Sequence, residues 1–389
     1  MFPIVFIMLT AAVFVACYTF FCARRLLKFY GADVRKKGVL AINILITIVV
    51  AVLCMNLFSN IGVVMLHAVA TFAILDVIAF FVRLFCKKSR KVRELSFNSE
   101  AFGIVLLRKV PVFLYGLYRC GLIPILAALL VFAYGTANMN NIRQTTYEIK
   151  TDKLEKNYRV VLLTDIHYNT VQPSDVLKDK LPEINAQKPD IVILGGDIVE
   201  EGTSKQEMQE AFRLLGSIDS RYGVYFVYGN HDQQPYTNSR TFTDEELVQA
   251  IEESGIRILE DEYIEIGTDL ILAGRGNAAW GATRKRPSTE EVLQGADRSK
   301  YIILVDHQPI GAEENAAWGV DLELSGHTHA GQIWPVGLFS ELAGVLNYGE
   351  YEREGCKVIV SSGVAGWRYS MRTGEHCEYV VIDIGHEKD

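Results

Sequence analysis

The chain has 389 residues, of which 50% are hydrophobic and 22% are charged, and its formal net charge is −7. This length allows two or three structural units with at least one sizeable core. Residues 1–137 hold 15 Lys and Arg against 4 Asp and Glu, whereas the remainder holds 24 against 42. The acidic second part repels polyanions, which excludes nucleic acid as an expected partner, while the basic first part suits membrane lipid.

Apolar runs dominate the first part. Three of them, at about residues 3–22, 39–58 and 61–82, are each long enough to cross a hydrocarbon core of about 30 Å as a helix. A fourth run, at about 113–136, contains Arg119 and is interrupted by Pro124. We therefore predict a transmembrane region of four helices over residues 1–137.

Basic residues between these runs set the expected orientation. Six lie between the first two runs, namely Arg24, Arg25, Lys28, Arg35, Lys36 and Lys37, and a second basic group spans residues 87–109. Both loops are expected to be cytoplasmic. The first run lacks a basic leader, so we interpret it as retained and not as a cleaved signal peptide. Four crossings then give a multi-pass protein of the cell membrane with an extracytoplasmic catalytic domain.

Two polar side chains inside the third run, His67 and Asp76, are candidates for a functional role because ionisable residues are costly within a membrane. Polar contacts inside a small helical bundle are the interpretation we favour.

Residues 138–157 are polar and are interpreted as a linker, and from 158 to 389 short β-rich runs alternate with amphipathic stretches, which is typical of an α/β domain. Strands are predicted at 158–164, 190–194, 224–228, 270–273, 301–305, 322–324, 357–361 and 379–384. Helices are predicted near 174–187, 204–216, 243–254 and 288–295. Cys356 and Cys377 are interpreted as buried and unpaired, with a disulfide between them as the alternative.

Five of the predicted strands end in residue types that bind metals. These are Asp165-Ile166-His167, Gly195-Gly196-Asp197, Gly229-Asn230-His231-Asp232, Asp306-His307 and Gly326-His327-Thr328-His329. Carboxyl ends of strands form the ligand crevices of α/β sheets. Each motif alone is weak evidence, since an isolated His is more often a core residue and Asn230 would suit a turn. Together they indicate a site for Mn, Fe, Zn or similar divalent ions.

The five motifs, in this order, resemble those of the calcineurin-like metallophosphoesterase superfamily. The Gly326–Gln332 run, together with Ser361-Ser362-Gly363, Arg368 and Arg372, is most similar to its bacterial membrane-associated branch, which includes UDP-2,3-diacylglucosamine pyrophosphatase-like enzymes. The resemblance covers roughly residues 155–385. It implies a β-sandwich of two mixed sheets flanked by helices, so the fold class we expect is α/β.

Carried over position by position, the resemblance implies two divalent metal ions. One would be held by Asp165, His167, Asp197 and His329, and the other by Asp197, Asn230, His307 and His327. Asp197 would be the bridge, and His231 would face the substrate as the general acid. The family's second Asp after Gly-Asp is replaced by Glu200, which puts in doubt the carboxylate that orients His231.

The expected function is therefore that of a membrane-anchored phosphoesterase, in which a metal-bridging hydroxide attacks a phosphomonoester, phosphodiester or diphosphate bond. The substrate is expected to be a phosphorylated small molecule or, more specifically, a lipid-linked or envelope compound. A catalytically silent membrane scaffold or sensor that binds phosphorylated ligands is the alternative.

Two groups of residues suggest finer features of the substrate site. Arg368 and Arg372 are candidates to clamp a second phosphate, with surface ion pairing as the equal alternative. An apolar lip for a lipid chain, as opposed to ordinary core, is suggested by Trp280, Trp334, Leu338, Phe339 and Trp367. A nucleotide-sugar lipid would normally be met on the cytoplasmic side, in conflict with the orientation inferred above, and we give the charge bias more weight.

Overall fold

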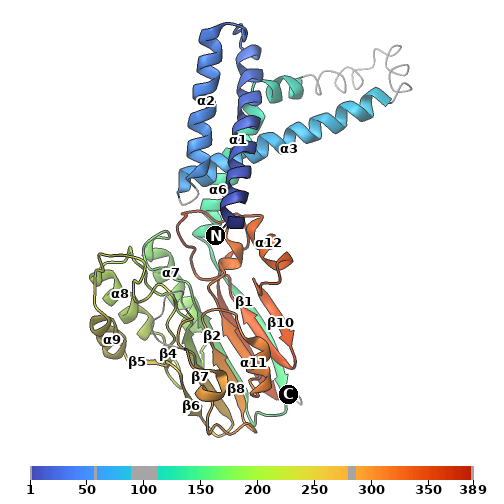
Figure 1. The fold of residues 1–389 in the computed structure, drawn as a ribbon. Helices are drawn as coiled ribbons and strands as arrows, with labels where there is room; N and C mark the ends of the chain where they lie inside the picture. The colour runs from blue at the N-terminus through green and yellow to red at the C-terminus, as the bar shows by residue number, and fades with distance from the viewer. Residues whose placement is uncertain (1, 57–58, 89–112, 279–285, 387–389) are drawn as a thin grey trace. The chain divides into compact units, whose positions relative to one another are not determined.

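The structure, a computed structural model, describes residues 2–56, 59–88, 113–278 and 286–386. It divides into two compact units, Met1–Tyr134 and Gly135–Asp389 (Figure 1). The boundary falls within the helix α6, which spans Leu122–Met139. Each unit is described by itself below.

Long helices make up the first unit, and they occupy the predicted spans as α1 Phe2–Phe29, α2 Lys37–Met55, α3 Asn60–Lys88 and the larger part of α6. Among the described residues, three stretches are long and apolar enough to cross a membrane: Lys37–Met55, Asn60–Phe81 and Leu122–Met139. The first predicted span lies in α1, where the side chains of residues 2–11 lie outside the described part. A fourth crossing therefore stays a prediction.

The predicted fourth run is divided, but not where we expected. A helical segment over 113–119 is followed by a turn that includes Gly121, which has a φ of 85°. The helix α6 begins at the next residue. Pro124 lies in the first turn of α6, where its missing N–H removes no helical hydrogen bond. The prediction that Pro124 interrupts the run was therefore wrong.

Asp76 takes part in a polar network within the first unit. Its carboxylate accepts hydrogen bonds from Arg25 at 2.6 Å and from the Tyr18 hydroxyl at 2.7 Å. A ring nitrogen of His67 lies 2.8 Å from the carbonyl oxygen of Val63. The Asp76 network joins α1 and α3 and is a polar contact of the kind we favoured, whereas this His67 contact lies within α3 itself.

Two six-stranded mixed sheets form the second unit. The first sheet has the order β1-β12-β2-β3-β4-β5, and the second has the order β10-β11-β9-β8-β7-β6. The strands of the first sheet are β1 Ile142–Thr151, β12 Cys377–His386, β2 Tyr158–Leu163, β3 Ile191–Leu194, β4 Val224–Phe226 and β5 Ile256–Ile258. Those of the second are β10 Gly349–Arg353, β11 Cys356–Val360, β9 Leu322–Ser325, β8 Tyr301–Val305, β7 Leu270–Gly274 and β6 Glu262–Ile266. β2, β3, β4 and β5 are parallel, as are β7, β8, β9 and β11.

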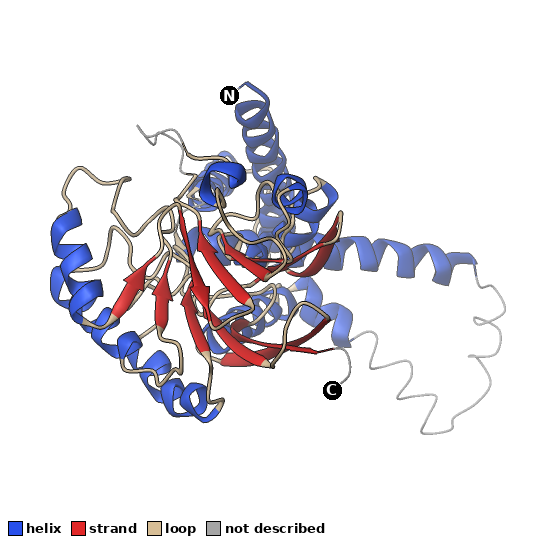
Figure 2. Cartoon of the chain, turned by 90° about the horizontal axis from the view of Figure 1, so that it is seen from below, coloured by secondary structure: helices blue, strands red, loops and turns tan. Residues whose placement is uncertain are grey.

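The sheets lie face to face with helices on their outer sides (Figure 2). Apolar side chains of both sheets, such as Leu162, Ile193 and Ile303, make one buried cluster between them. The outer face of the first sheet is covered by α7 Ser174–Ala186, α8 Lys205–Gly216 and α9 Asp244–Glu253, and the outer face of the second by α10 Thr289–Val292 and α11 Ala312–Ala317. This layered α/β sandwich is the fold class that the resemblance implied.

Local sequence explains where several of these helices begin. Ser204, Thr243 and Ser288 each accept a hydrogen bond from the backbone N–H three residues later, and the Glu at that later position returns the bond. Such capping boxes satisfy N–H groups that have no partner within the helix. The four predicted helices start within one residue of their observed positions, three of them at these capping boxes, whereas α7 begins after Pro173 without a side-chain cap.

The interpretation of residues 138–157 as a linker was wrong. β1 occupies Ile142–Thr151 and pairs along its whole length with β12. It is an edge strand with mostly exposed or half-buried residues, so its sequence is polar although its backbone is fully part of the sheet. Only Asn140 and Asn141 separate it from the end of α6.

Cys356 and Cys377 are both buried and free, which agrees with the unpaired interpretation. The Cys377 thiol donates a hydrogen bond to the carbonyl oxygen of Met139, at the end of α6.

Candidate metal centre

The loops that follow β2, β3, β8 and β9 bring two groups of metal-binding side chains together. Asp165, His167 and His329 form the first group, and Asp197, His307 and His327 form the second. Within each group, one carboxylate oxygen or ring nitrogen from every residue lies within 4.8 Å of the others. His327 is exposed, whereas the other five side chains are buried. The sequence-predicted ligands thus meet at one end of the sandwich.

Asp197, a member of the second group, also faces the first. Its Oδ1 accepts a hydrogen bond from the backbone N–H of His231 at 2.8 Å, which fixes the carboxylate. Its Oδ2 lies 3.8 Å from Nε2 of His167 and 3.1 Å from Nε2 of His307. One oxygen therefore faces a histidine of each group, as a carboxylate shared by two cations would.

Backbone contacts hold the remaining acid and imidazole groups in position. Asp165 accepts the His327 backbone N–H at both of its carboxylate oxygens, at 3.1 and 3.0 Å. Nδ1 of His307 lies 2.8 Å from the Gly195 carbonyl oxygen, an acceptor that leaves Nε2 directed at Asp197. Nε2 of His329 lies 3.5 Å from Oδ1 of Asp165.

Asn230, the seventh predicted ligand, is buried in the loop that follows β4. Its side-chain oxygen accepts a long hydrogen bond of 3.4 Å from Gln308, one residue beyond His307. This oxygen is a neutral candidate ligand atom, and its partner Gln308 adjoins His307 of the second group.

The backbone at the site is strained. Asp165, Asp197 and His167 have φ values of 53°, 51° and 42°, and His327 and His329 also have positive φ. Non-glycine residues rarely adopt this left-handed region, and such outliers gather at functional sites where surrounding structure enforces them. The strain directs these side chains into one small volume.

Glycines in the motifs make the close approach possible. A Cβ on Gly229 would lie 2.2 Å from Oδ1 of Asp197, and a Cβ on Gly326 would lie 2.2 Å from Oδ2 of Asp165. Any other residue there would displace a carboxylate. This explains the glycine that precedes Asn230 and the one that precedes His327.

The donor set fits divalent cations. Nε2 of His167 is buried and has no hydrogen-bond partner among the described residues, although such buried groups normally have one. Burial alone would lower the pKa of His307, but the Asp197 carboxylate outweighs it and raises that pKa to about 10. The same carboxylate attracts a divalent cation. On binding, the cation would displace the proton that the raised pKa keeps on His307.

His231 is buried beside the two groups, and a carboxylate holds it. Its Nδ1 lies 2.7 Å from Oε2 of Glu201, and its ring centroid lies 5.3 Å from that of Trp367 and 5.1 Å from that of Tyr236. The doubt about the orienting carboxylate is thereby resolved, because the partner is Glu201. Glu200, at the family's Asp position, lies 3.1 Å from Nδ1 of His167.

Asp232 has a positioning role that the sequence motif alone did not reveal. Its fully buried carboxylate accepts the backbone N–H groups of Gly229 at 2.6 Å, Asp197 at 2.9 Å, Ile198 at 2.8 Å and Val199 at 3.2 Å. It therefore ties the loop of Asp197 to the loop of His231.

One of the two finer predictions, the arginine clamp, changes with the structure. Arg372 is fully buried and donates to the carbonyl oxygens of His329, Ser362 and Ala365, so it is neither a phosphate clamp nor a surface ion pair. Arg368 is exposed and lies 5.1 Å over the ring of Trp367, beside His231. Trp280 lies outside the described residues.

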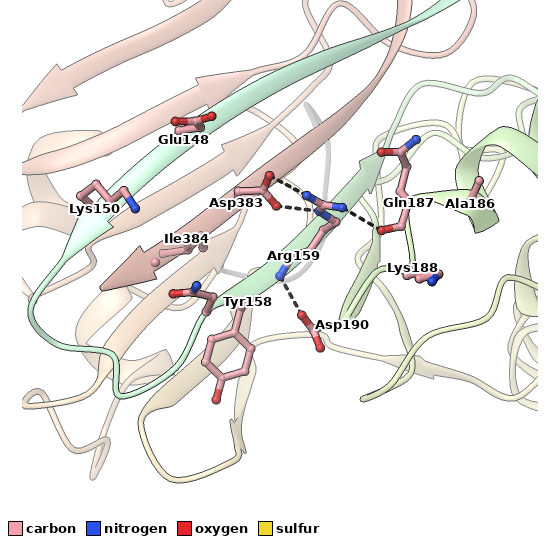
Figure 3. A pocket seen from close by; sticks show the side chains of 12 residues that line it. Glu148, Lys150, Tyr158, Arg159, Ala186, Gln187, Lys188, Asp190, Asp383 and Ile384 are labelled. Atoms are coloured by element: carbon pink, nitrogen blue, oxygen red, sulfur yellow. Dashed lines mark hydrogen bonds and ion pairs between the residues drawn. The ribbon is translucent and has the colours of Figure 1, made fainter. Parts of the chain in front are cut away.

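A cavity of about 640 Å³ lies at the opposite end of the first sheet, near the start of β2. In it Arg159 forms two hydrogen bonds with Asp383 and a third with the Gln187 carbonyl oxygen, while Asp190 accepts the Arg159 backbone N–H (Figure 3). These polar groups satisfy one another. We therefore assign the chemistry to the metal-binding groups.

Comparison with known proteins agrees with this assignment. Residues 158–331 match the family described as calcineurin-like phosphoesterase. The chain carries a calcineurin-like metallophosphoesterase domain. The family is one of phosphoester hydrolases that use divalent metals, and the matched residues include all the candidate ligands.

Similar proteins carry related names. An "Uncharacterized metallophosphoesterase" of Helicobacter pylori J99 is 32% identical over 58% of this chain and 59% of its own length. One of Aquifex aeolicus is 29% identical over 66% of this chain and 97% of its own length. A bovine "Transmembrane protein with metallophosphoesterase domain" is 29% identical over 67% of this chain and 62% of its own length. The chain thus aligns with less than two thirds of the Helicobacter and bovine proteins.

Proposed function

We propose that this metallophosphoesterase is a membrane-anchored enzyme that uses two divalent cations to hydrolyse a phosphomonoester, phosphodiester or diphosphate. The observation that carries the proposal is the position of Asp197, whose Oδ2 faces His167 and His307 from opposite groups. Asp165, His167 and His329 would hold one ion, Asn230, His307 and His327 would hold the other, and Asp197 would be a ligand of both. Cations bound there would lower the pKa of a shared water and neutralise charge on the phosphoryl oxygens.

His231 supplies the proton in this proposal. Glu201 engages its Nδ1, so the other ring nitrogen, Nε2, is the atom that can donate to the leaving oxygen. A silent scaffold has no need for a histidine oriented by a carboxylate next to the ligands. This pair therefore favours the enzyme over the binding-only alternative.

The substrate we propose is lipid-linked or part of the cell envelope. Three described stretches are apolar enough to cross a membrane, and only two residues separate the last helix from the first strand of the catalytic unit. This connection keeps the active site near the bilayer. The charge bias of the loops favours an extracytoplasmic domain, which reporter fusions at the carboxyl terminus would test.

Two substitutions test the chemistry. Asp197→Ala should abolish hydrolysis of an aryl phosphoester and lower the bound metal, because it removes the shared carboxylate. His231→Ala should keep the metal and reduce the rate by about 10²- to 10⁴-fold, the usual contribution of a general acid. Full turnover by the Asp197 variant, with metal content unchanged, would refute the proposed centre.

A further inference from the structure

Apolar side chains are exposed in one short segment of the catalytic unit. In the described part of residues 135–389, eight large hydrophobic side chains are exposed, and six of them lie within residues 334–345. These six, which we call the α12 surface, are Trp334, Val336, Leu338, Phe339, Leu342 and Val345, with exposed fractions from 46% to 76%. The helix α12 itself, Val336–Leu342, has no buried residue. Such a concentration marks an interaction surface.

Trp334, the first residue of the α12 surface, is connected to the last turn of α6 through two backbone hydrogen bonds. The backbone N–H of Arg372 donates to the Gly135 carbonyl oxygen at 2.9 Å. The next residue, Thr373, accepts a hydrogen bond from the Trp334 backbone N–H at its hydroxyl oxygen, at 3.1 Å. One dipeptide therefore bridges the end of α6 and the start of the α12 surface.

The length of α6 fixes the depth of that turn if the helix crosses a membrane. Its 18 residues span about 27 Å at 1.5 Å per residue, slightly less than a hydrocarbon core of about 30 Å. The last turn then has to lie at the boundary between acyl chains and headgroups. Arg372, which is hydrogen-bonded to that turn, then lies at this level, and Trp334, which is hydrogen-bonded to the next residue, lies close to it.

We infer that the α12 surface inserts into the outer edge of the same bilayer and holds the catalytic unit against it. Trp334 is the residue type that favours this depth. Glu341 is the only ionisable residue between residues 332 and 346, so the contact is apolar and does not depend on anionic headgroups. Because the chain continues from His329 through Gln332 into this segment, insertion sets how near the metal centre lies to a phosphoester in the membrane.

Fluorescence of the full chain in lipid nanodiscs tests the contact without relying on activity. All four tryptophans, Trp280, Trp318, Trp334 and Trp367, lie after residue 270, so none is in the spanning helices. Nanodiscs of phosphatidylcholine with and without brominated acyl chains are compared for the wild type, Trp334→Phe and Trp318→Phe. Most of the bromine quenching should disappear in Trp334→Phe and persist in Trp318→Phe. Equal quenching in all three proteins would overturn the inference. Absence of quenching would also overturn it, and is the result expected if a second copy of the chain covers the surface.

Kinetics then test the consequence. The double variant Leu338→Glu with Leu342→Glu should lower kcat/KM for a phosphoester embedded in the bilayer by about tenfold or more. It should leave hydrolysis of a soluble aryl phosphoester unchanged, and so should Ile310→Glu, an exposed apolar control outside the surface. An equal loss on both substrates would overturn the role in access. If the wild type hydrolyses neither substrate, the proposed function fails, whereas the bromine result still decides the membrane contact.

Discussion

Glu200 and Glu201 are adjacent, yet their carboxylates contact histidines with different proposed tasks. Oε2 of Glu201 lies 2.7 Å from His231, the proposed acid, and Oε2 of Glu200 lies 3.1 Å from His167, a proposed ligand. The substitutions Glu201→Gln and Glu200→Gln keep the shape of each side chain and remove its charge. They form a matched pair one residue apart.

Glu201→Gln should reduce the rate and leave the metal in place. A hydrogen bond to a charged group contributes about 1.5–3 kcal/mol. At about 1.4 kcal/mol per factor of ten, this corresponds to a loss of roughly 10- to 150-fold in kcat. Glu201 is partly exposed, with 19% of its side chain accessible, so water screens the pair and the lower half of that range is expected.

Glu200→Gln should act on the metal instead. Residues that hydrogen-bond a metal-ligating histidine typically change metal affinity or activity by about 10- to 100-fold. Burial raises the pKa of the Glu200 carboxyl, but its interaction with His167 outweighs burial, so the pKa is lowered and the group is charged at neutral pH. The variant should therefore lose metal on dialysis and regain activity when metal is added.

The assay is elemental analysis of the dialysed full chain together with aryl phosphoester turnover across a metal titration. The expected pattern is full metal and low kcat for Glu201→Gln, and low metal with a rate restored by added metal for Glu200→Gln. Identical behaviour of the two variants, or restoration of Glu201→Gln by metal, would refute the assignment of separate tasks.

Three further outcomes are expected. Chelation should lower the unfolding midpoint by about 5–10 °C, because a site occupied at 100 times Kd contributes about 2.7 kcal/mol; an unchanged midpoint in calorimetry argues against bound metal. Asp232→Asn replaces one accepting oxygen by an amide, leaving two buried N–H groups without an acceptor at about 1–3 kcal/mol each, so denaturant unfolding should show lower stability and dialysis lower metal content. Burial, aided by the Asp306 charge, raises the pKa of Glu323 to about 7 from an ordinary 4.5. Between pH 4.5 and about 7 the folded state keeps a proton on Glu323 that the unfolded state has released. The free energy of unfolding therefore falls with rising pH, by up to about 1.4 kcal/mol per pH unit. Glu323→Gln should therefore gain stability relative to the wild type from pH 5 to 7, and a flat difference in unfolding midpoint would contradict this.

Eight strands were predicted from the sequence, and all eight are present as β2, β3, β4, β7, β8, β9, β11 and β12. The four that were missed are β1, β5, β6 and β10, which are the two edges of each sheet. Interior strands are covered on both faces and read as continuous apolar runs, whereas edge strands are half exposed and read as polar or mixed segments. Tyr158–Leu163 illustrates the first case and Ile142–Thr151 the second.

The sequence by itself placed the metal-binding residue types together, because parallel strands bring their carboxyl ends to one edge of a sheet. The assignment of individual ligands and of the family came from the resemblance of the motifs to calcineurin-like metallophosphoesterases. The tertiary structure alone decided which oxygen of Asp197 faces both histidine groups, that Glu201 and not Glu200 contacts His231, and that Arg372 is buried. These facts depend on left-handed backbone turns and on contacts between loops far apart in the chain. Residue type and spacing do not encode them, because adjacent side chains such as Glu200 and Glu201 differ only in the direction that the fold gives them.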